Sequence, residues 1–381
     1  MGDRGSQLRL GIIGLGRRMG VMLGALRRAD PACTLTAVAD PRQADIRLAL
    51  GEQGVREGTR WYSRAEEMLA AEAGALDAIL IGSRCSSHAA LALQALPTGL
   101  PLFLEKPVAT TLPDLLQLKA GADTYGGHRV LVSFPLRMTP MAALVKQLVD
   151  SGVIGTVEHV QAVTNIAYGS VYFKRWYRDE AETGGLFLQK ATHDLDVINY
   201  LLGQQPVMVC AMGSKQIFRG TRPAGLRCED CADRAACPDS ELPGESCCYA
   251  VDTGNEDSGS LLIRYASGMH VSYSQNFFVR RAAGNRSIRL MGYKGTIEFE
   301  WESDTIKLML HHSPVVETFT VGAAREPHFG GDRALAEHFV SMVRDEAASR
   351  ASLQDGLISA LLCLKAKQSS AENRFLPVEW A

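Results

Sequence analysis

The sequence predicts an α/β protein whose first third forms a doubly wound parallel sheet and whose second half is rich in strands. In the first third, short apolar runs alternate with amphipathic segments, which is typical of parallel strands joined by helices. The first apolar run ends in a glycine-rich turn. In the second half, strand-like runs follow one another with few helical segments between them. The length of 381 residues is enough for two domains.

The first predicted strand, residues 8–13, ends in the glycine-rich turn and leads into an amphipathic helix. Gly14 and Gly16 match the first two positions of the dinucleotide-binding pattern G-x-G-x-x-G, whereas Met19 takes the third. Gly20 follows one residue late. Glycines here let the backbone approach a pyrophosphate, which the free N–H groups of the helix N-terminus bind. We therefore expect this turn to bind a dinucleotide.

A second apolar run, residues 35–39, ends at Asp40, where a carboxylate is expected to meet the adenosine ribose hydroxyls. A carboxylate repels the 2′-phosphate of NADP, so Asp40 favours NAD as the cofactor. NADP stays open as the alternative, because Arg17, Arg18 or Arg42 can pair with that phosphate.

The alternation then continues through strands at 78–81, 102–104 and 130–134 and helices at 88–96 and 112–120. Ligands of such sheets bind beyond the carboxyl ends of the strands, and a lysine directly after a buried strand is a functional candidate there. The cofactor site predicted in this way consists of Gly14, Gly16, Arg17, Arg18, Met19, Asp40, Ser83, His88, Glu105 and Lys106.

The second half holds one segment with a polar stripe. Gln189, His193, Asp196 and Tyr200 follow one another at spacings of four, three and four, so they share a face of a predicted helix that ends near Gly203. Such a stripe on an otherwise apolar helix needs either solvent or a polar site. Strand-like runs occupy 157–167, 207–218, 258–265, 269–277, 287–291, 296–301 and 305–311, and a closing helix is expected over 352–369.

Taken in order, these motifs resemble the family of glucose–fructose oxidoreductase, inositol dehydrogenase and rhizopine-catabolism proteins, known as Gfo/Idh/MocA. The resemblance covers nearly the whole chain. It is carried by the glycine turn 14–20, Asp40, 83–88, Glu105-Lys106-Pro107, 134–140 with Arg137, 151–155, 184–203 with His193 and Asp196, and 328–335.

The resemblance implies an N-terminal Rossmann domain over 1–136 and an α+β domain with an open, largely antiparallel sheet over 137–381. Members commonly associate through that sheet, so a homodimer or homotetramer is expected. The implied activity is hydride transfer between NAD(P) and a secondary alcohol of a sugar, cyclitol or sugar derivative. One alternative is a glycosidase-like or epimerase-like enzyme that retains its NAD and oxidises the substrate transiently. A second alternative is a non-catalytic dinucleotide-sensing regulator.

The family also implies the catalytic roles of two residues. The lysine of the Glu-Lys-Pro motif corresponds to Lys106, which would orient the hydroxyl and stabilise negative charge on its oxygen. The helix histidine corresponds to His193, which would act as the general acid/base because an imidazole exchanges protons near neutral pH. A regulator has no need of both residues.

This chain departs from the family at one site position. Many members have an aspartate four residues before the histidine, whereas Gln189 stands there and cannot accept a proton. Lys190, Asp194 and Asp196 are the candidates to compensate, and we prefer Asp196, as a partner of His193 or of a substrate hydroxyl. The expected substrate contacts are Arg137, Tyr168, Gln189, Asp196 and His328.

A cysteine-rich insertion is expected over residues 219–256. Cys228, Cys231, Cys237 and Cys247 have a spacing that suits a structural zinc site with four thiolates. Redox-active thiols or a disulfide, and cysteines that bind nothing, are the alternatives.

The composition excludes several classes of partner. The formal net charge is −2, and no dense Lys/Arg block supports binding to nucleic acid or a membrane surface. No apolar run is long enough to span a bilayer, and the start lacks a secretory pattern. We therefore expect a cytoplasmic enzyme that acts on a small, sugar-like molecule.

Overall fold

A computed structural model describes residues 7–47, 58–240 and 244–380 of the chain. The chain forms two compact units, one made of residues 1–139 and 330–360 and the other of residues 140–329 and 361–381. The chain therefore enters each unit twice. The domain limits expected from the sequence, 1–136 and 137–381, stay predictions.

The first unit is built on a six-stranded sheet with the order β3-β2-β1-β4-β5-β6. All neighbouring strands are parallel. This order confirms the predicted doubly wound sheet, because the chain moves outward from β1 in one direction and then in the other. The strands are β1 (Leu8–Ile13), β2 (Cys33–Ala39), β3 (Arg60–Tyr62), β4 (Ala78–Ile81), β5 (Leu102–Leu104) and β6 (Val130–Val132).

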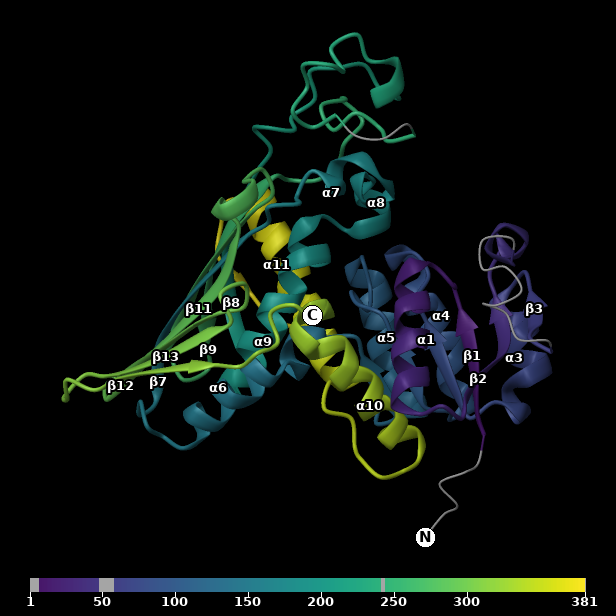
Figure 1. Ribbon diagram of the computed structural model, residues 1–381, viewed down its shortest axis with the longest axis horizontal. Coiled ribbons are helices and arrows are strands. Elements are labelled where there is room, and N and C mark those ends of the chain that lie inside the picture. Colours follow the sequence, from purple (N-terminus) through teal and green to yellow (C-terminus); the bar gives the residue numbers. More distant parts are fainter. Residues whose placement is uncertain (1–6, 48–57, 241–243, 381) are drawn as a thin grey trace. The chain divides into compact units, whose positions relative to one another are not determined.

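Helices cover this sheet. They are α1 (Arg17–Ala29), α3 (Ala65–Glu72), α4 (His88–Ala95), α5 (Leu112–Tyr125) and α10 (Gly331–Val343). Helix α1 buries Met19, Met22 and Leu26 completely. Helix α10 comes from far along the chain and lies beside α1 (Figure 1). Its Phe339 ring meets the edge of Phe103 in β5, with the ring centroids 5.5 Å apart.

The second unit contains a nine-stranded sheet with the order β14-β13-β12-β11-β7-β10-β9-β8-β15. Strands β7 and β10 are parallel and the other pairs are antiparallel, which confirms the expected largely antiparallel sheet. The strands are β7 (Val157–Asn165), β8 (Pro206–Ser214), β9 (Ser258–Tyr265), β10 (His270–Asn276), β11 (Asn285–Gly292), β12 (Gly295–Glu300), β13 (Thr305–Leu310), β14 (Val316–Thr320) and β15 (Leu376–Pro377).

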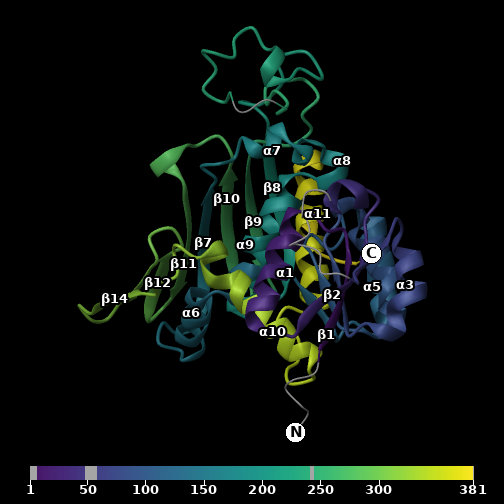
Figure 2. The same cartoon turned by 45° about the vertical axis from the view of Figure 1, so that its right-hand side comes forward.

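Helices pack on one face of this sheet, as Figures 1 and 2 show for α6 and α9. The strands accordingly alternate between buried and exposed side chains, most regularly in β9. The helices are α6 (Pro140–Asp150), α7 (Val171–Lys174), α8 (Glu180–Thr183), α9 (Thr192–Leu202) and α11 (Leu353–Glu372), whose first eight residues belong to the first unit.

A buried ion pair fastens α9 to the sheet. Arg286 of β11 donates two hydrogen bonds to Asp194 of α9, from Nε at 2.7 Å and from Nη2 at 3.2 Å. The Tyr273 hydroxyl of β10 donates to the same carboxylate at 3.0 Å. Burial lowers the pKa of Arg286, but Asp194 outweighs this effect and the pKa ends above its ordinary value. The Arg286 guanidinium therefore stays charged, and removing either partner would leave the other buried without it.

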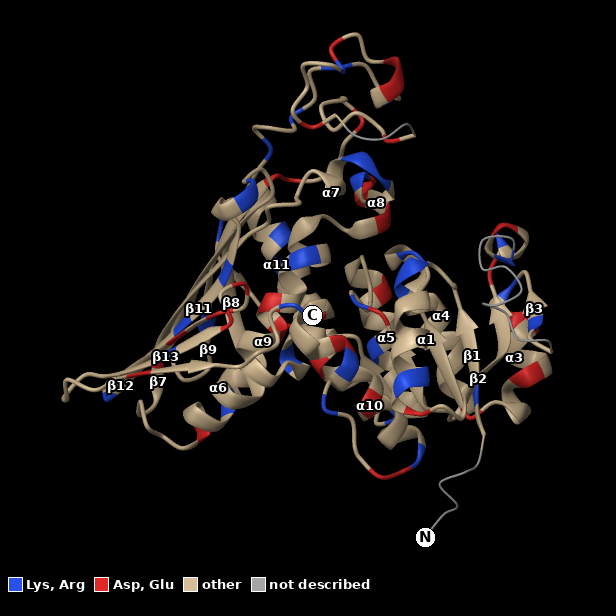
Figure 3. Ribbon diagram, viewed as in Figure 1, with Lys and Arg blue, Asp and Glu red and all other residues tan. Residues whose placement is uncertain are grey.

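Lys and Arg are interspersed with Asp and Glu along both units in the view of Figure 3. Within the described ranges, no helix combines the length and the apolar character needed to cross a bilayer.

Replacing Arg286 by Met should lower the free energy of unfolding by about 3–5 kcal/mol, because Asp194 is left buried without its counter-charge. The matched control is Arg289→Met on the same strand, which removes an exposed pair with Glu298 and should cost less than about 1 kcal/mol. Urea denaturation measures both values. Equal losses in the two variants would show that the Asp194 pair does not hold α9 to the sheet.

Candidate functional site

The glycine turn between β1 and α1 is closed against the loop that follows β4. Gly14 has a φ of +82°, and a Cβ atom there would lie 2.6 Å from the backbone nitrogen of Ser83. Only glycine fits such a position. Gly16 precedes the first turn of α1, and a Cβ added to it would meet nothing within 4 Å. The turn is therefore tight on its inner side and open at the N-terminus of α1, as a phosphate-binding turn requires.

Met19 replaces the third glycine of the usual pattern, and the structure shows what compensates for it. The Met19 side chain is fully buried and lies where a side chain of residue 82 would be. A Cβ atom on Gly82 would stand 2.2 Å from the Met19 Cγ. The close approach of helix and sheet thus depends on Gly82 instead of a glycine in α1. Sequence reasoning missed Gly82, whose signal is a glycine directly after a buried strand.

Asp40 follows β2 and is buried at the carboxyl end of the sheet. Its carboxylate accepts hydrogen bonds from the backbone N–H of Leu15, at 3.2 Å, and of Arg42, at 2.8 Å. The Arg42 Nε lies 3.7 Å from the same carboxylate. Asp40 therefore joins the glycine turn to the turn after β2, and its place beside a bound ribose stays a prediction.

Arg18 is held by two carboxylates of the first unit. Its Nε donates to Glu105 at 2.8 Å, and its Nη1 lies 2.8 Å from Asp332 of α10. Its Nη2 donates to the Ser133 hydroxyl at 3.2 Å. Burial lowers the pKa of Arg18, and the two carboxylates more than offset this effect. Gly330 is the N-cap residue of α10, and Asp332 in the first turn of that helix binds Arg18.

The loop after β4 and the Glu105-Lys106-Pro107 turn are joined through His88. The buried His88 ring places Nδ1 2.8 Å from the Pro107 carbonyl and Nε2 3.3 Å from the Ser83 carbonyl. Burial lowers the pKa of His88, which favours the neutral ring. The Ser83 hydroxyl lies 2.7 Å from that of Ser87. His88 thus supports the backbone that carries Lys106.

Arg137, an expected substrate contact, is buried in the first unit. Its Nη1 donates to the Arg350 carbonyl at 2.9 Å and lies 3.1 Å from the Asp355 carboxylate. These contacts give Arg137 a structural role, so its role in substrate binding stays a prediction without support from the geometry.

In the second unit, the polar segment begins with a π-helical turn, Phe187–Ala191, and continues as α9. Gly184 ends α8 with a φ of +77°, and Gly185 follows with a φ of +94°. A π turn holds more residues than an α turn, so the α-helical spacing expected between Gln189 and His193 does not hold. Gln189 and Lys190 are both buried in this turn.

Lys190 reaches Tyr168, which the sequence did not indicate. The Lys190 Nζ donates to the Tyr168 hydroxyl at 3.0 Å and lies 5.5 Å from the centre of its ring. The positive charge of Lys190 is the largest influence on the Tyr168 hydroxyl and lowers its pKa to about 8, although burial opposes the shift. Arg286 and a hydrogen bond from Tyr172 lower it further.

His193 lies in the first turn of α9, with the His328 ring 6.5 Å away and nearly parallel. His328 and Phe329 have φ values of +45° and +55°, which are unusual for residues with side chains. The structure therefore brings two of the predicted site residues together within the second unit. Asp196 is completely buried in α9.

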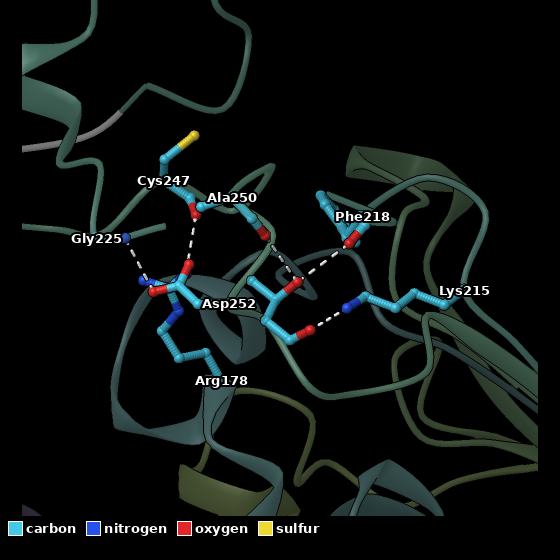
Figure 4. Close-up of polar contacts among 8 residues, drawn as sticks. Arg178, Lys215, Phe218, Gly225, Cys247, Ala250 and Asp252 are labelled. Carbon is cyan, nitrogen blue, oxygen red and sulfur yellow. Dashed lines mark hydrogen bonds and ion pairs between the residues drawn. The ribbon is translucent and has the colours of Figure 1, made fainter. Parts of the chain in front are cut away.

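The cysteine-rich segment is attached to the second unit by polar contacts to the backbone (Figure 4). Arg178 donates to Asp252 at 2.5 Å, and Asp252 accepts from the Gly225 N–H at 3.1 Å. Lys215 donates to the Thr253 carbonyl, and the Thr253 hydroxyl donates to the Phe218 carbonyl at 3.2 Å. Residues 241–243 of this segment lie outside the described part of the chain.

The structure does not support zinc binding by Cys228, Cys231, Cys237 and Cys247. Among the described residues, no group of three or more His, Cys, Asp or Glu side chains is arranged to hold a metal ion. Burial raises the pKa of the Cys247 thiol, and its cysteine neighbours add to the rise.

Two sequence models of one family together match most of the chain. The model described as "Oxidoreductase family, NAD-binding Rossmann fold" matches residues 8–134. The model described as "Oxidoreductase family, C-terminal alpha/beta domain" matches residues 146–379.

Individual relatives agree with this match. The chain is 27% identical to the putative oxidoreductase YteT of Bacillus subtilis, over 68% of this chain and 71% of the relative. It is 26% identical to inositol 2-dehydrogenase of Rhizobium meliloti, over 97% and 99%. Among solved structures, a levoglucosan dehydrogenase in complex with NADH and levoglucosan superimposes with a TM-score of 0.78 at 18% identity, over 98% of this chain and all of the other. The chain belongs to the Gfo/Idh/MocA family of oxidoreductases.

Proposed function

We propose that this protein is an NAD-dependent oxidoreductase that transfers a hydride between the nicotinamide ring and a secondary alcohol of a sugar, cyclitol or sugar derivative. The main support is the glycine turn, closed on Ser83 by Gly14 and tied to Asp40, in the NAD-binding sheet of this family. The polyol class rests on relatives named inositol 2-dehydrogenase and levoglucosan dehydrogenase.

The residues of the first unit fit NAD better than NADP. Bound NAD supplies an acceptor or donor for the hydride. The turn at Gly14 and Gly16 would hold the pyrophosphate, and the buried Asp40 carboxylate would accept hydrogen bonds from the ribose hydroxyls. Arg18 is engaged by Glu105 and Asp332 and so offers no counter-charge to a 2′-phosphate. We keep Arg17, Met19, Ser83, His88 and Lys106 as further residues of this site.

For the chemical step, we propose that His193 exchanges the proton of the reacting hydroxyl and that Lys106 stabilises negative charge on its oxygen. His193 has support from its place at the start of α9, beside His328. Tyr168, Gln189, Asp196 and His328 are the proposed substrate contacts in the second unit. Gln189 can hydrogen-bond a hydroxyl but cannot take its proton.

The presence of Gln189 in place of an aspartate favours one alternative function, transient oxidation of the substrate by a retained NAD. Without a carboxylate at residue 189, the proton-transfer set of the family is incomplete, which suits an enzyme that retains NAD and oxidises its substrate only transiently.

We further propose that the enzyme is a cytoplasmic homodimer or homotetramer. All nine cysteines lie in the described residues and none forms a disulfide, as in a reducing compartment. Exposed Met212 and Leu262, on neighbouring strands of the nine-stranded sheet, give that surface apolar character.

Absorbance of NADH should rise when the protein is mixed with NAD and a panel of inositols and sugars, because hydride moves to the nicotinamide. The panel is read in parallel by chromatography, which detects substrate conversion without net NADH. Conversion with co-purified NAD and no NADH signal would favour the transient-oxidation alternative. Absence of any conversion across the panel would contradict both enzymatic proposals.

His193→Asn and Lys106→Met should each lower kcat by about 10²–10⁴-fold, because proton exchange and charge stabilisation are lost. Calorimetric NAD affinity should stay within a few-fold for His193→Asn. His159→Asn, which changes a histidine of β7 next to His270, is the matched control and should keep normal turnover. If both site variants turned over like this control, the catalytic assignment would be rejected.

Asp40→Ser should weaken NAD binding by about 10- to 100-fold, since charge-assisted hydrogen bonds to the ribose are lost. NADP binding should improve relative to NAD, because the repelling carboxylate is gone. Fluorescence titration with each dinucleotide measures both affinities. An unchanged ratio of the two affinities would show that Asp40 does not select the cofactor.

A further inference from the structure

The pair formed by Lys190 and Tyr168 has a role that the proposed catalytic residues leave open. We propose that Lys190 holds the Tyr168 oxygen as an anionic acceptor for a second substrate hydroxyl, so that the pair selects polyols over simple alcohols. This inference rests on the proposed function, because it needs a substrate with more than one hydroxyl.

Lys190 is a buried positive charge. It is 6% exposed, and within the described part of the chain its Nζ contacts the Tyr168 hydroxyl and ring rather than a carboxylate. Its hydrogen bond at 3.0 Å goes to the Tyr168 hydroxyl. A buried ammonium needs a compensating charge or acceptor, and an ionised phenol supplies both. The pairing therefore favours the phenolate form of Tyr168.

The Tyr168 ring is accessible. Tyr168 follows β7 and is 60% exposed as a residue, whereas its hydroxyl is held by Lys190 and is sheltered enough for burial to act on its pKa. A purely structural bond does not need an exposed ring. The ring of Tyr168 packs against the buried Tyr172 ring, and the partly exposed rings of Tyr177 and Trp176 follow, with centroids of successive rings 6.4, 5.3 and 4.0 Å apart. The exposed Tyr168 ring suits an apolar C–H face of a cyclic polyol, and the buried Tyr172 ring supports it from behind.

Lys190 lies in the π-helical turn three residues before His193, next to Gln189. Turns of this kind are rare and are frequently found at functional sites. Here the turn carries a buried lysine that is bonded to Tyr168 and that precedes the proposed acid/base in the chain.

The charges around Tyr168 come from three elements. Lys190 has the largest effect and acts with Arg286 of β11 and the Tyr172 hydroxyl of α7, so that the pKa of Tyr168 is lowered to about 8 although burial opposes the change. The Arg286 charge is itself shared with Asp194, 2.7 Å from its Nε. Burial and the neighbours Tyr168 and Tyr177 raise the pKa of Tyr172, which therefore remains a hydrogen-bond donor.

The ionisation can be tested without cofactor or activity. Near-ultraviolet absorbance of the full-length protein follows phenolate formation as the pH rises. We expect a step near pH 8 that is absent from Tyr168→Phe and shifted to higher pH in Lys190→Met, because the ammonium that favours the phenolate is gone. The control Tyr125→Phe removes a tyrosine that is 53% exposed and should keep the step. A step that survives in Tyr168→Phe would overturn the proposal.

The recognition role is tested by comparing a polyol that the enzyme oxidises with cyclohexanol, which has one hydroxyl. In the wild type, KM for the polyol should fall as the pH rises through about 8 and then level off. Tyr168→Phe should raise that KM by about 10- to 100-fold at pH 9 with kcat changed less than threefold, and should leave KM for cyclohexanol unchanged.

The two proposals fail in different ways. If no polyol is oxidised, the proposed function fails, while the absorbance step still reports whether Lys190 ionises Tyr168. If a polyol is oxidised but the Tyr168→Phe variant loses kcat with KM unchanged, or loses activity on cyclohexanol equally, the recognition role of the pair is overturned and the proposed function stands.

Discussion

The second unit depends on the buried contact between the Asp194 carboxylate and the Arg286 guanidinium. Because neither charge is stable in the protein interior without the other, the pair fixes the position of helix α9 against strand β11. His193 precedes Asp194 in the chain, and the π-helical turn with Lys190 precedes both. The same arginine also acts on Tyr168. One ion pair thus fixes the helix, places the histidine and contributes to the charge around the tyrosine.

Much of the fold could be predicted because its strands are marked locally. The bounds of β4, β5 and β9 agree with the apolar runs, since these strands are bounded by turn residues and buried on at least one face. Strand β14 was missed because Val316–Thr320 is an edge strand with mostly exposed side chains, so it has no apolar pattern. The π-helical turn was missed because spacing arguments assume a regular α-helix.

The residues of the candidate site could be predicted where they belong to one continuous sequence motif. Contacts between residues that are far apart in the sequence could not be predicted. Gly14 and Asp40 were indicated by their spacing along the chain. The fit of Met19 against Gly82, and the binding of Arg18 by Asp332, join segments whose proximity only the folded chain reveals. Arg18 is a residue whose role could not be predicted from its sequence neighbours. Its place beside the glycine turn suggested a phosphate ligand, whereas two carboxylates hold it.

The return of α10 to the first unit has a consequence for synthesis of the protein. The ribosome completes residue 139 well before it reaches residue 330, with the bulk of the second unit made in between. At usual elongation rates this interval lasts roughly 10 to 40 seconds. Meanwhile the nascent sheet lacks the Phe339 ring that packs on Phe103 and the Asp332 carboxylate, one of the two that bind Arg18. The cofactor-binding half is translated first, yet it matures among the last parts of the chain.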